Sequence, residues 1–132
     1  MANHQGVPMK TRDQLPECPV ATTVQLIGSK WKLLILRNLI ARPWRFNELK
    51  RDLDGISNKV LTESLRSMEE DGIITRTVVS TSPKYVEYSL SEKGLSLIPI
   101  LQMLSEWGLK HMFPNMVSFP GEVVSEPDKA DV

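Results

Sequence analysis

The chain has 132 residues, a length typical of one domain with a modest hydrophobic core. Its composition, 41% hydrophobic and 24% charged, is that of a globular protein and excludes a mainly disordered chain. Sixteen Lys and Arg balance 16 Asp and Glu, and a net charge of zero by itself argues against a strongly cationic nucleic-acid-binding surface.

The rarer residue types exclude several kinds of site. A single cysteine, Cys18, excludes an intramolecular disulfide framework and a zinc site built from several cysteines. The two histidines lie far apart, so we expect no metal, no cofactor and no catalytic centre. The N-terminus has no signal-peptide pattern, and the most apolar stretch, 95–104, is far shorter than the roughly 20 residues of a membrane span. We therefore expect a cytoplasmic protein with no membrane partner.

The first part of the chain predicts an arm followed by four helices. Residues 1–16 are polar and without periodicity, and we expect a flexible arm there; the folded domain is predicted over 17–113. Apolar residues at helical spacing predict helices over 19–27, 30–41, 48–53 and 58–71, with a short extended segment over 44–46. The expected capping residues are Pro19, Gly28, Ser29, Asn47, Ser57 and Gly72.

Two strands and a last helix follow. The β-branched run 73–79 and the alternating segment 85–90 predict a hairpin with its turn at 80–84. Ser91 is expected to cap a helix that reaches about residue 111, and Pro99 inside it predicts a kink. The segment 114–132 carries three prolines and four acids against one lysine, which predicts a polar, acidic tail.

The third and fourth predicted helices form a helix-turn-helix pattern. A turn containing Gly55 joins them, and the hairpin follows, so the sequence predicts a winged helix-turn-helix. This fold is mainly α (α+β), with a wing of two to three strands. In such motifs the second helix enters the major groove, and its N-terminal residues reach base edges. The polar face of this helix supplies suitable groups on Ser57, Asn58, Lys59, Thr62 and Arg66. An isolated helix with this pattern is more often an ordinary solvated surface; the neighbouring elements favour DNA binding.

The neutral total charge divides unevenly along the chain. Residues 30–93 hold twelve Lys or Arg against nine Asp or Glu, an excess of three positive charges. Residues 111–132 hold one base against four acids, an excess of three negative charges. The predicted helix-turn-helix is thus mildly cationic, which supports nucleic-acid binding only weakly.

Several motifs in order resemble those of the HxlR-type winged-helix transcriptional regulators. They include Cys18-Pro-Val, Gly28-Ser-Lys-Trp-Lys-Leu-Leu, Arg45-Phe-Asn-Glu-Leu-Lys-Arg, Gly55-Ile-Ser-Asn-Lys-Val-Leu and Tyr88-Ser-Leu-Ser-Glu-Lys-Gly. The resemblance covers about residues 18–110. It implies a homodimer that binds double-stranded DNA at a pseudo-palindromic operator, with the first and last helices forming the dimer interface. Such a dimer blocks or recruits polymerase, and we expect a repressor.

The resemblance also adds DNA-contacting residues outside the recognition helix. It implies that Arg76 and Lys84 of the hairpin contact the DNA backbone or minor groove, and that Arg45 contacts a phosphate. The family often has an arginine where this chain has Ser64, so one DNA contact of other members is expected to be absent.

The last predicted helix is apolar around much of its circumference. A monomer of this size covers one face of such a helix, so we expect the excess to pack against a second copy. A central core helix in a monomer is the alternative. The predicted interface residues are Val20, Val24, Leu97, Ile98, Leu101, Leu104 and Trp107.

Cys18 matches an N-terminal cysteine that senses small electrophiles or oxidants in some members of the family. Its position at the start of a helix favours the thiolate form of a cysteine. With no second cysteine, a switch needs a bond between subunits, a mixed disulfide or alkylation. A small, buried packing residue is the more frequent role of such a cysteine.

Two other functions compete with a DNA-binding regulator. A winged-helix protein-interaction module without DNA binding fits the neutral charge and the acids Glu63, Glu69 and Glu70. A thiol enzyme using Cys18 is disfavoured, because neither histidine falls in a Cys/His/Asn pattern and no phosphate-binding glycine loop is visible.

Overall fold

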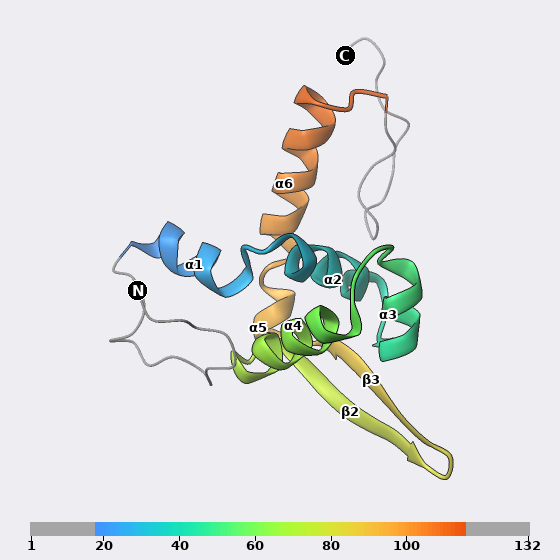
Figure 1. Cartoon of the computed structure of the whole chain (residues 1–132). Helices are drawn as coiled ribbons and strands as arrows, with labels where there is room; N and C mark the ends of the chain where they lie inside the picture. The colour runs from blue at the N-terminus through green and yellow to red at the C-terminus, as the bar shows by residue number, and fades with distance from the viewer. Residues whose placement is uncertain (1–17, 116–132) are drawn as a thin grey trace.

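The computed structural model describes residues 18–115. The predicted arm, 1–16, and the predicted tail, apart from Pro114 and Asn115, lie outside the described residues. The described residues form six helices and a three-stranded antiparallel sheet. The order is α1, α2, β1, α3, α4, β2, β3, α5 and α6, as Figure 1 shows. This confirms the predicted winged helix-turn-helix of mixed α and β structure.

The first two helices begin and end where the sequence predicts. α1 spans Pro19–Ile27, with the proline in its first turn, and α2 spans Lys30–Ala41. The Ser29 hydroxyl oxygen accepts a hydrogen bond of 3.0 Å from the backbone N–H of Lys32, which caps α2.

The two helices of the predicted helix-turn-helix also form. α3 spans Phe46–Asp52 and α4 spans Asn58–Glu70, and Ser57 caps α4 by accepting a 3.1 Å hydrogen bond from the Val60 N–H. Gly55 has φ of +91°, the left-handed conformation that the turn between them requires. The predicted cap Asn47 is wrong. The N-cap of α3 is Arg45, two residues earlier. Its backbone N–H donates to the Glu48 carboxylate at 2.9 Å, because a glutamate lies at the third helical position.

The sheet consists of the hairpin and one short strand before α3. β2 spans Ile74–Thr81, β3 spans Lys84–Leu90, and β1 is only Trp44–Arg45. β3 lies in the centre, antiparallel to both neighbours, with Trp44 opposite Tyr88. The predicted turn, 80–84, is longer than the observed one, since pairing continues out to Thr81 and Lys84. The hairpin projects from the helices as a wing (Figure 1).

The predicted last helix is two helices rather than one kinked helix. α5 spans Glu92–Leu95 and α6 spans Ile98–His111. Pro99 lies in the first turn of α6, where its missing N–H costs no helical hydrogen bond. The prediction of a kink at Pro99 is therefore wrong: the proline starts a helix. α6 projects away from the domain on the side opposite the wing (Figure 1).

The hydrophobic core lies between α2, α4 and the base of the sheet. Its central side chains are fully enclosed: Ile35, Leu36, Leu49, Leu61, Leu65, Met68 and Ile73. Leu101 of α6 is only 3% exposed and joins this core, and Leu97 packs against it. The core therefore fixes α3, α4 and the wing as one unit, with the polar face of α4 directed outward.

Candidate nucleic-acid interface

The predicted DNA-reading face of α4 lies on the surface. Asn58, Lys59, Thr62 and Arg66 are all exposed, whereas Leu61 and Leu65 of the same helix are buried. None of these four side chains is bonded to another side chain in the part of the chain described, so their donors and acceptors are available to bases and phosphates. Glu63 lies on the same exposed face and brings one negative charge to it.

Two serines of this region behave differently from the four exposed residues. The oxygen of Ser57 accepts the Val60 N–H, so one of its two acceptor positions is used, and its hydroxyl proton and the other position remain for DNA. Ser64 is 8% exposed and belongs to the inner side of α4. The arginine that the family often has at this position would therefore begin on the core side of α4 and not on its exposed face.

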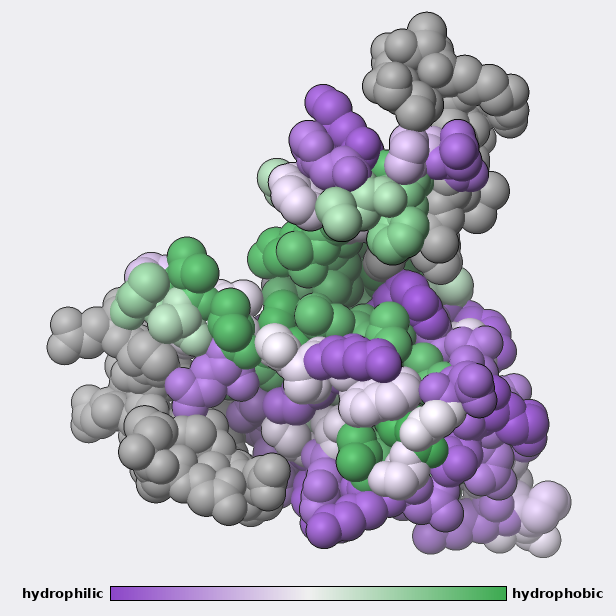
Figure 2. Space-filling model, turned by 45° about the horizontal axis from the view of Figure 1, so that its top comes forward, coloured by the Kyte–Doolittle hydropathy of each residue, from purple (hydrophilic) through white to green (hydrophobic). Residues whose placement is uncertain are grey.

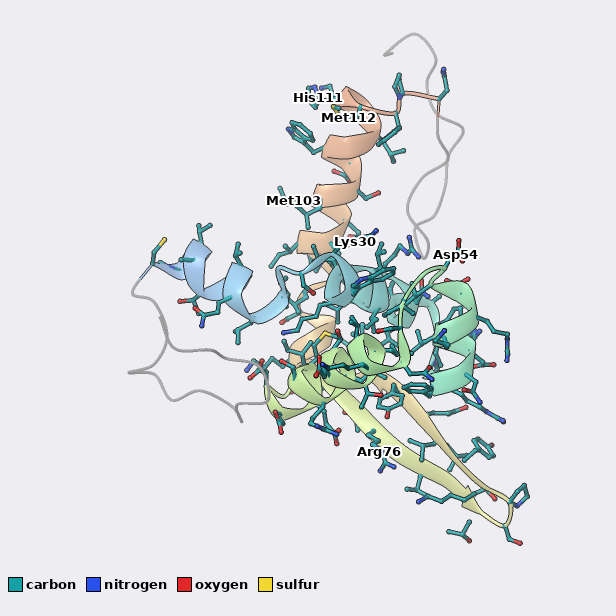
Figure 3. The ribbon with its side chains drawn as sticks, viewed as in Figure 1. Lys30, Asp54, Arg76, Met103, His111 and Met112 are labelled. Carbon is teal, nitrogen blue, oxygen red and sulfur yellow. The ribbon has the colours of Figure 1, made fainter. Side chains whose placement is uncertain are left out.

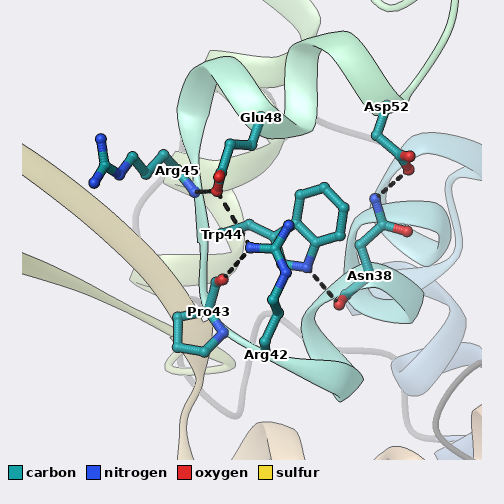
Figure 4. A network of polar contacts seen from close by, with 7 residues as sticks. All are labelled: Asn38, Arg42, Pro43, Trp44, Arg45, Glu48 and Asp52. Atoms are coloured by element: carbon teal, nitrogen blue, oxygen red, sulfur yellow. Dashed lines mark hydrogen bonds and ion pairs between the residues drawn. The ribbon is translucent and has the colours of Figure 1, made fainter.

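A polar network fixes the segment that leads into α3 (Figure 4). Asn38, 7% exposed, donates its amide to the Asp52 carboxylate at 2.8 Å, and its backbone carbonyl accepts the Trp44 indole N–H at 2.8 Å. The Arg42 guanidinium lies over the Trp44 ring at 3.8 Å and bonds to Glu48 at 3.3 Å. Together these contacts tie the end of α2 to the start of α3.

Glu48 accepts from two groups in this network. Its hydrogen bond from the Arg45 backbone N–H lowers the pKa of the Glu48 carboxyl from its ordinary value, and the Arg42 guanidinium lowers this pKa further. The positive charges of Arg42 and Arg45 both favour the ionised form of Glu48. The Arg45 side chain points away from the network (Figure 4).

The three basic residues predicted outside α4 meet in one groove. Arg45, Arg76 and Lys84 are exposed and line a groove of about 650 Å³ between α3 and the wing. Arg76 lies on β2, below α4 in Figure 3. The Arg45 guanidinium lies 3.7 Å from the centre of the Tyr85 ring, which holds it in place by a cation–π contact.

The same groove contains residues that sequence reasoning missed. Asn47 and Arg51 of α3 line it, together with Tyr85 of β3. Asn47 and Arg51 are four positions apart, so their shared face was readable from the sequence. Their position opposite the wing was not, because it depends on how α3 packs against the sheet.

The predicted dimer residues divide between surface and core. Val20, Val24, Leu104 and Trp107 are 54–71% exposed, whereas Ile98 is half-buried. Leu101 is buried and Leu97 is half-buried, because both pack on the core of their own chain. The exposed apolar side chains of α6 also include Ile100 and Met103, and Figure 2 shows apolar surface on both α1 and α6.

Cys18 is exposed and precedes α1. Its carbonyl accepts the Thr22 N–H at 2.9 Å, so the residue starts the helix through its backbone. Because the thiol is exposed, Cys18 does not have the alternative role of a small residue buried by packing.

Comparison with known proteins identifies the family of this chain. The model of the HxlR-like helix-turn-helix family matches residues 26–116. The chain belongs to the HxlR-like family. It is 42% identical over 99 residues to the HTH-type transcriptional regulator YdeP of Bacillus subtilis, covering 75% of this chain and 77% of YdeP.

Solved structures agree with this assignment. A structure of the HTH-type transcriptional regulator YtcD is 46% identical with a TM-score of 0.69, covering 72% of this chain and 97% of that one. The redox regulator HypR in its oxidised form is 44% identical with a TM-score of 0.66, covering 69% and 94%. The HxlR-like chain is thus a helix-turn-helix transcriptional regulator, and its relatives are regulators rather than enzymes. In residues 18–115 no helix is both long and apolar enough to cross a membrane.

Proposed function

We propose that this HxlR-like protein is a cytoplasmic homodimer that binds a pseudo-palindromic operator in double-stranded DNA and represses transcription by occupying it. The observation that carries the proposal is the exposed polar face at the N-terminal end of α4, on a helix whose other face is fixed in the core. Because the backbone of this helix is already ordered, binding costs side-chain but little backbone conformational entropy.

The residues divide by role on this face. Asn58 and Arg66 offer amide and guanidinium groups for base edges, where Asn pairs with adenine and Arg with guanine. Lys59 and Thr62 supply further donors to bases or phosphates, and the Ser57 hydroxyl supplies one more. Arg45, Arg76 and Lys84 contact phosphates on either side, which sets the register without reading sequence.

The homodimer rests on the apolar surface of α1 and α6. Val20 and Val24 on α1 and Leu104 and Trp107 on α6 leave large apolar side chains in water, which a second copy of the chain covers. Two copies related by a two-fold axis present two α4 helices, and this matches a pseudo-palindromic site.

The test uses the double variant Lys59→Ala, Arg66→Ala. A duplex is first selected by the wild-type protein from a random pool, and its affinity for both proteins is then measured by fluorescence anisotropy. Loss of two contacts per protomer, at roughly 1–3 kcal/mol for each base contact, is expected to weaken binding by about 30-fold or more. Equal affinity of variant and wild type would exclude α4 as the reading helix.

A protein-interaction module without DNA binding is the second candidate, and Glu63 on the α4 face favours it. It predicts that no duplex is bound in a salt-dependent manner. The selection experiment separates the two, because a module of this kind enriches no sequence.

We further propose that Cys18 makes DNA binding responsive to a small electrophile or oxidant. The exposure of its thiol supports this. Diamide treatment is expected to change the DNA affinity of the wild type and not that of Cys18→Ser. An identical response of both proteins would remove the thiol from the account.

A further inference from the structure

The groove between α3 and the wing is lined by more cationic side chains than the three to which the proposed function gives DNA contacts. Its lining includes four cationic side chains, Arg45, Arg51, Arg76 and Lys84, and one carboxylate, Glu48. Glu48 is already bonded to Arg42, outside the groove lining, and to the Arg45 backbone. Within residues 18–115, none of the four cations forms an ion pair. Cationic side chains therefore outnumber carboxylates in the groove lining by four to one.

Arg51 and Asn47 face this groove from one side of α3. They are one helical turn apart, and both are exposed. Arg51 offers the planar fork of donors that fits a phosphate, and the Asn47 amide can donate one more hydrogen bond. Neither side chain has a hydrogen-bond partner in the described part of the chain. The other arginines of α2 and α3 differ: Arg37 and Arg42 are engaged with Asp52 and Glu48.

The spacing of the cations favours an extended polyanion over a small one. Arg76 pairs with Tyr88 near the base of the wing, whereas Lys84 pairs with Thr81 at its tip. The five residues from position 76 to position 81 span roughly 17 Å of strand, at about 3.4 Å per residue. One small anion cannot contact both ends, but the sugar–phosphate backbone of a duplex can run along the groove. No residue of α4 lines the groove, but α4 packs on β2, the strand that carries Arg76.

We propose that this groove binds a segment of the DNA backbone outside the bases read by α4. Arg51 and Asn47 bind a phosphate there, and Tyr85 is a positioning residue that holds Arg45 toward the same segment. The inference rests on the proposed DNA binding and adds contacts from α3 that lengthen the footprint of each protomer.

The first test compares Arg51→Gln with Lys110→Gln. Lys110 is exposed in the last turn of α6, far from the wing, so this variant removes the same charge elsewhere. Binding to the selected duplex is measured from 50 to 300 mM salt. Each lost phosphate contact flattens the slope of log K against log salt by about 0.9, so two protomers are expected to lose roughly 1.8 in Arg51→Gln. The slope of Lys110→Gln is expected to match that of the wild type.

The second test locates the phosphate. Single phosphates of the selected duplex are replaced by neutral methylphosphonates, and each duplex is bound to wild type and to Arg51→Gln. At one position per half-site, neutralisation is expected to weaken wild-type binding several-fold and leave Arg51→Gln unaffected. If both proteins lose the same affinity at every position, Arg51 binds no phosphate and the inference fails.

The third test concerns Tyr85. Tyr85→Phe keeps the ring under Arg45, whereas Tyr85→Leu removes it. Phe is expected to retain the wild-type salt slope, and Leu to flatten it. Equal slopes for all three proteins would overturn the positioning role.

These outcomes are distinguishable from failure of the proposed function. If the wild type binds no duplex with a negative salt slope, DNA binding itself fails. If it binds with such a slope but Arg51→Gln matches it, only the groove is excluded. Inorganic phosphate at millimolar concentration provides a last comparison: Arg51-dependent binding of this ion with an unchanged DNA slope would assign the groove to a free anion and overturn the inference.

Discussion

Packing around position 94 leaves room for glycine and for no larger residue. Ser91 donates its backbone N–H to the Ile73 carbonyl at 3.0 Å and its hydroxyl also lies against this oxygen, which brings the start of α5 directly onto the start of β2. A Cβ at position 94 would overlap the same Ile73 oxygen. Only glycine therefore allows α5 to close the base of the wing.

Replacement of the two glycines of α5 and α6 should have opposite effects. Gly94→Ala is expected to lower the free energy of unfolding by roughly 1–3 kcal/mol, because backbone atoms must shift. Gly108→Ala is the matched control, since no heavy atom lies within 4 Å of a Cβ there, and it is expected to raise stability by about 0.5–1 kcal/mol through helix propensity. Urea unfolding measures both. Equal stability of Gly94→Ala and wild type would show that the α5–β2 contact is loose.

Individual site residues were predictable where they depend on local pattern. The outward position of Asn58, Lys59, Thr62 and Arg66 follows from the apolar positions of the same helix, and the structure has all four exposed. Arg51 was not predictable as a groove residue, because no local pattern tells which side of a seven-residue helix meets a strand nearly 30 residues later.

At the scale of elements, two of the wrong predictions concern where helices begin. Helical spacing alone does not tell whether Asn47 or Arg45 caps α3. The deciding contact is the hydrogen bond that the Glu48 carboxylate accepts from the Arg45 backbone N–H. Likewise, Pro99 was compatible with a kink or a first turn. The break before α6 follows from Leu97 and Leu101 packing on the core, a tertiary contact that the pattern of one helix does not contain.

The start of α3 gives a pH-dependent stability. The pKa of Glu48 is lower in the folded protein than its ordinary value of 4.5, so its contribution is present above pH 4.5 and is lost as pH falls through the lowered pKa. Glu48→Gln is expected to be slightly less stable than wild type at neutral pH, with the difference shrinking on acidification. Urea midpoints at several pH values test this.

Glu69→Gln provides the control for this pH effect. Glu69 is exposed near the end of α4 and forms no ion pair within the described residues. If the stability difference between Glu48→Gln and wild type stayed the same at low pH, the negative charge of Glu48 would not be what stabilises the start of α3.

At the scale of the whole molecule, the wing and the surface proposed for dimerisation lie at opposite ends. The wing and α6 project in opposite directions, and the exposed apolar residues gather on α1 and α6 (Figures 1 and 2). The apolar character of the last helix was predictable from sequence, but the core side of α6 was not separable from its free side without the structure.

The apolar surface of α1 and α6, proposed as the dimer interface, gives a prediction on the oligomeric state. The variant Leu104→Glu, Trp107→Glu places two charges on an exposed apolar face and is expected to be monomeric by sedimentation analysis, with weaker operator binding. Val79→Glu is the control, because Val79 is 44% exposed on the wing, and it should sediment as the wild type does. A Leu104→Glu, Trp107→Glu variant that sediments as the wild type would place the dimer interface elsewhere.

The acidic tail gives a prediction from charge alone. Residues 116–132 lie outside the described part of the chain, but the segment from 115 carries a net charge of minus three. Removing 115–132 is expected to strengthen binding to a scrambled duplex at low salt, because less negative charge faces the phosphates. An unchanged affinity for this duplex would leave the tail without an electrostatic role.

In the proposed function, α4, which is fixed by the core, reads the DNA sequence. The most direct measurement is the affinity of the wild-type protein for a duplex selected from a random pool and for the same duplex scrambled, at physiological salt. Specific recognition predicts a two-fold symmetric selected sequence bound about 1,000-fold or more tightly than the scrambled one. Equal affinity for the two duplexes, or binding independent of salt, would contradict the account.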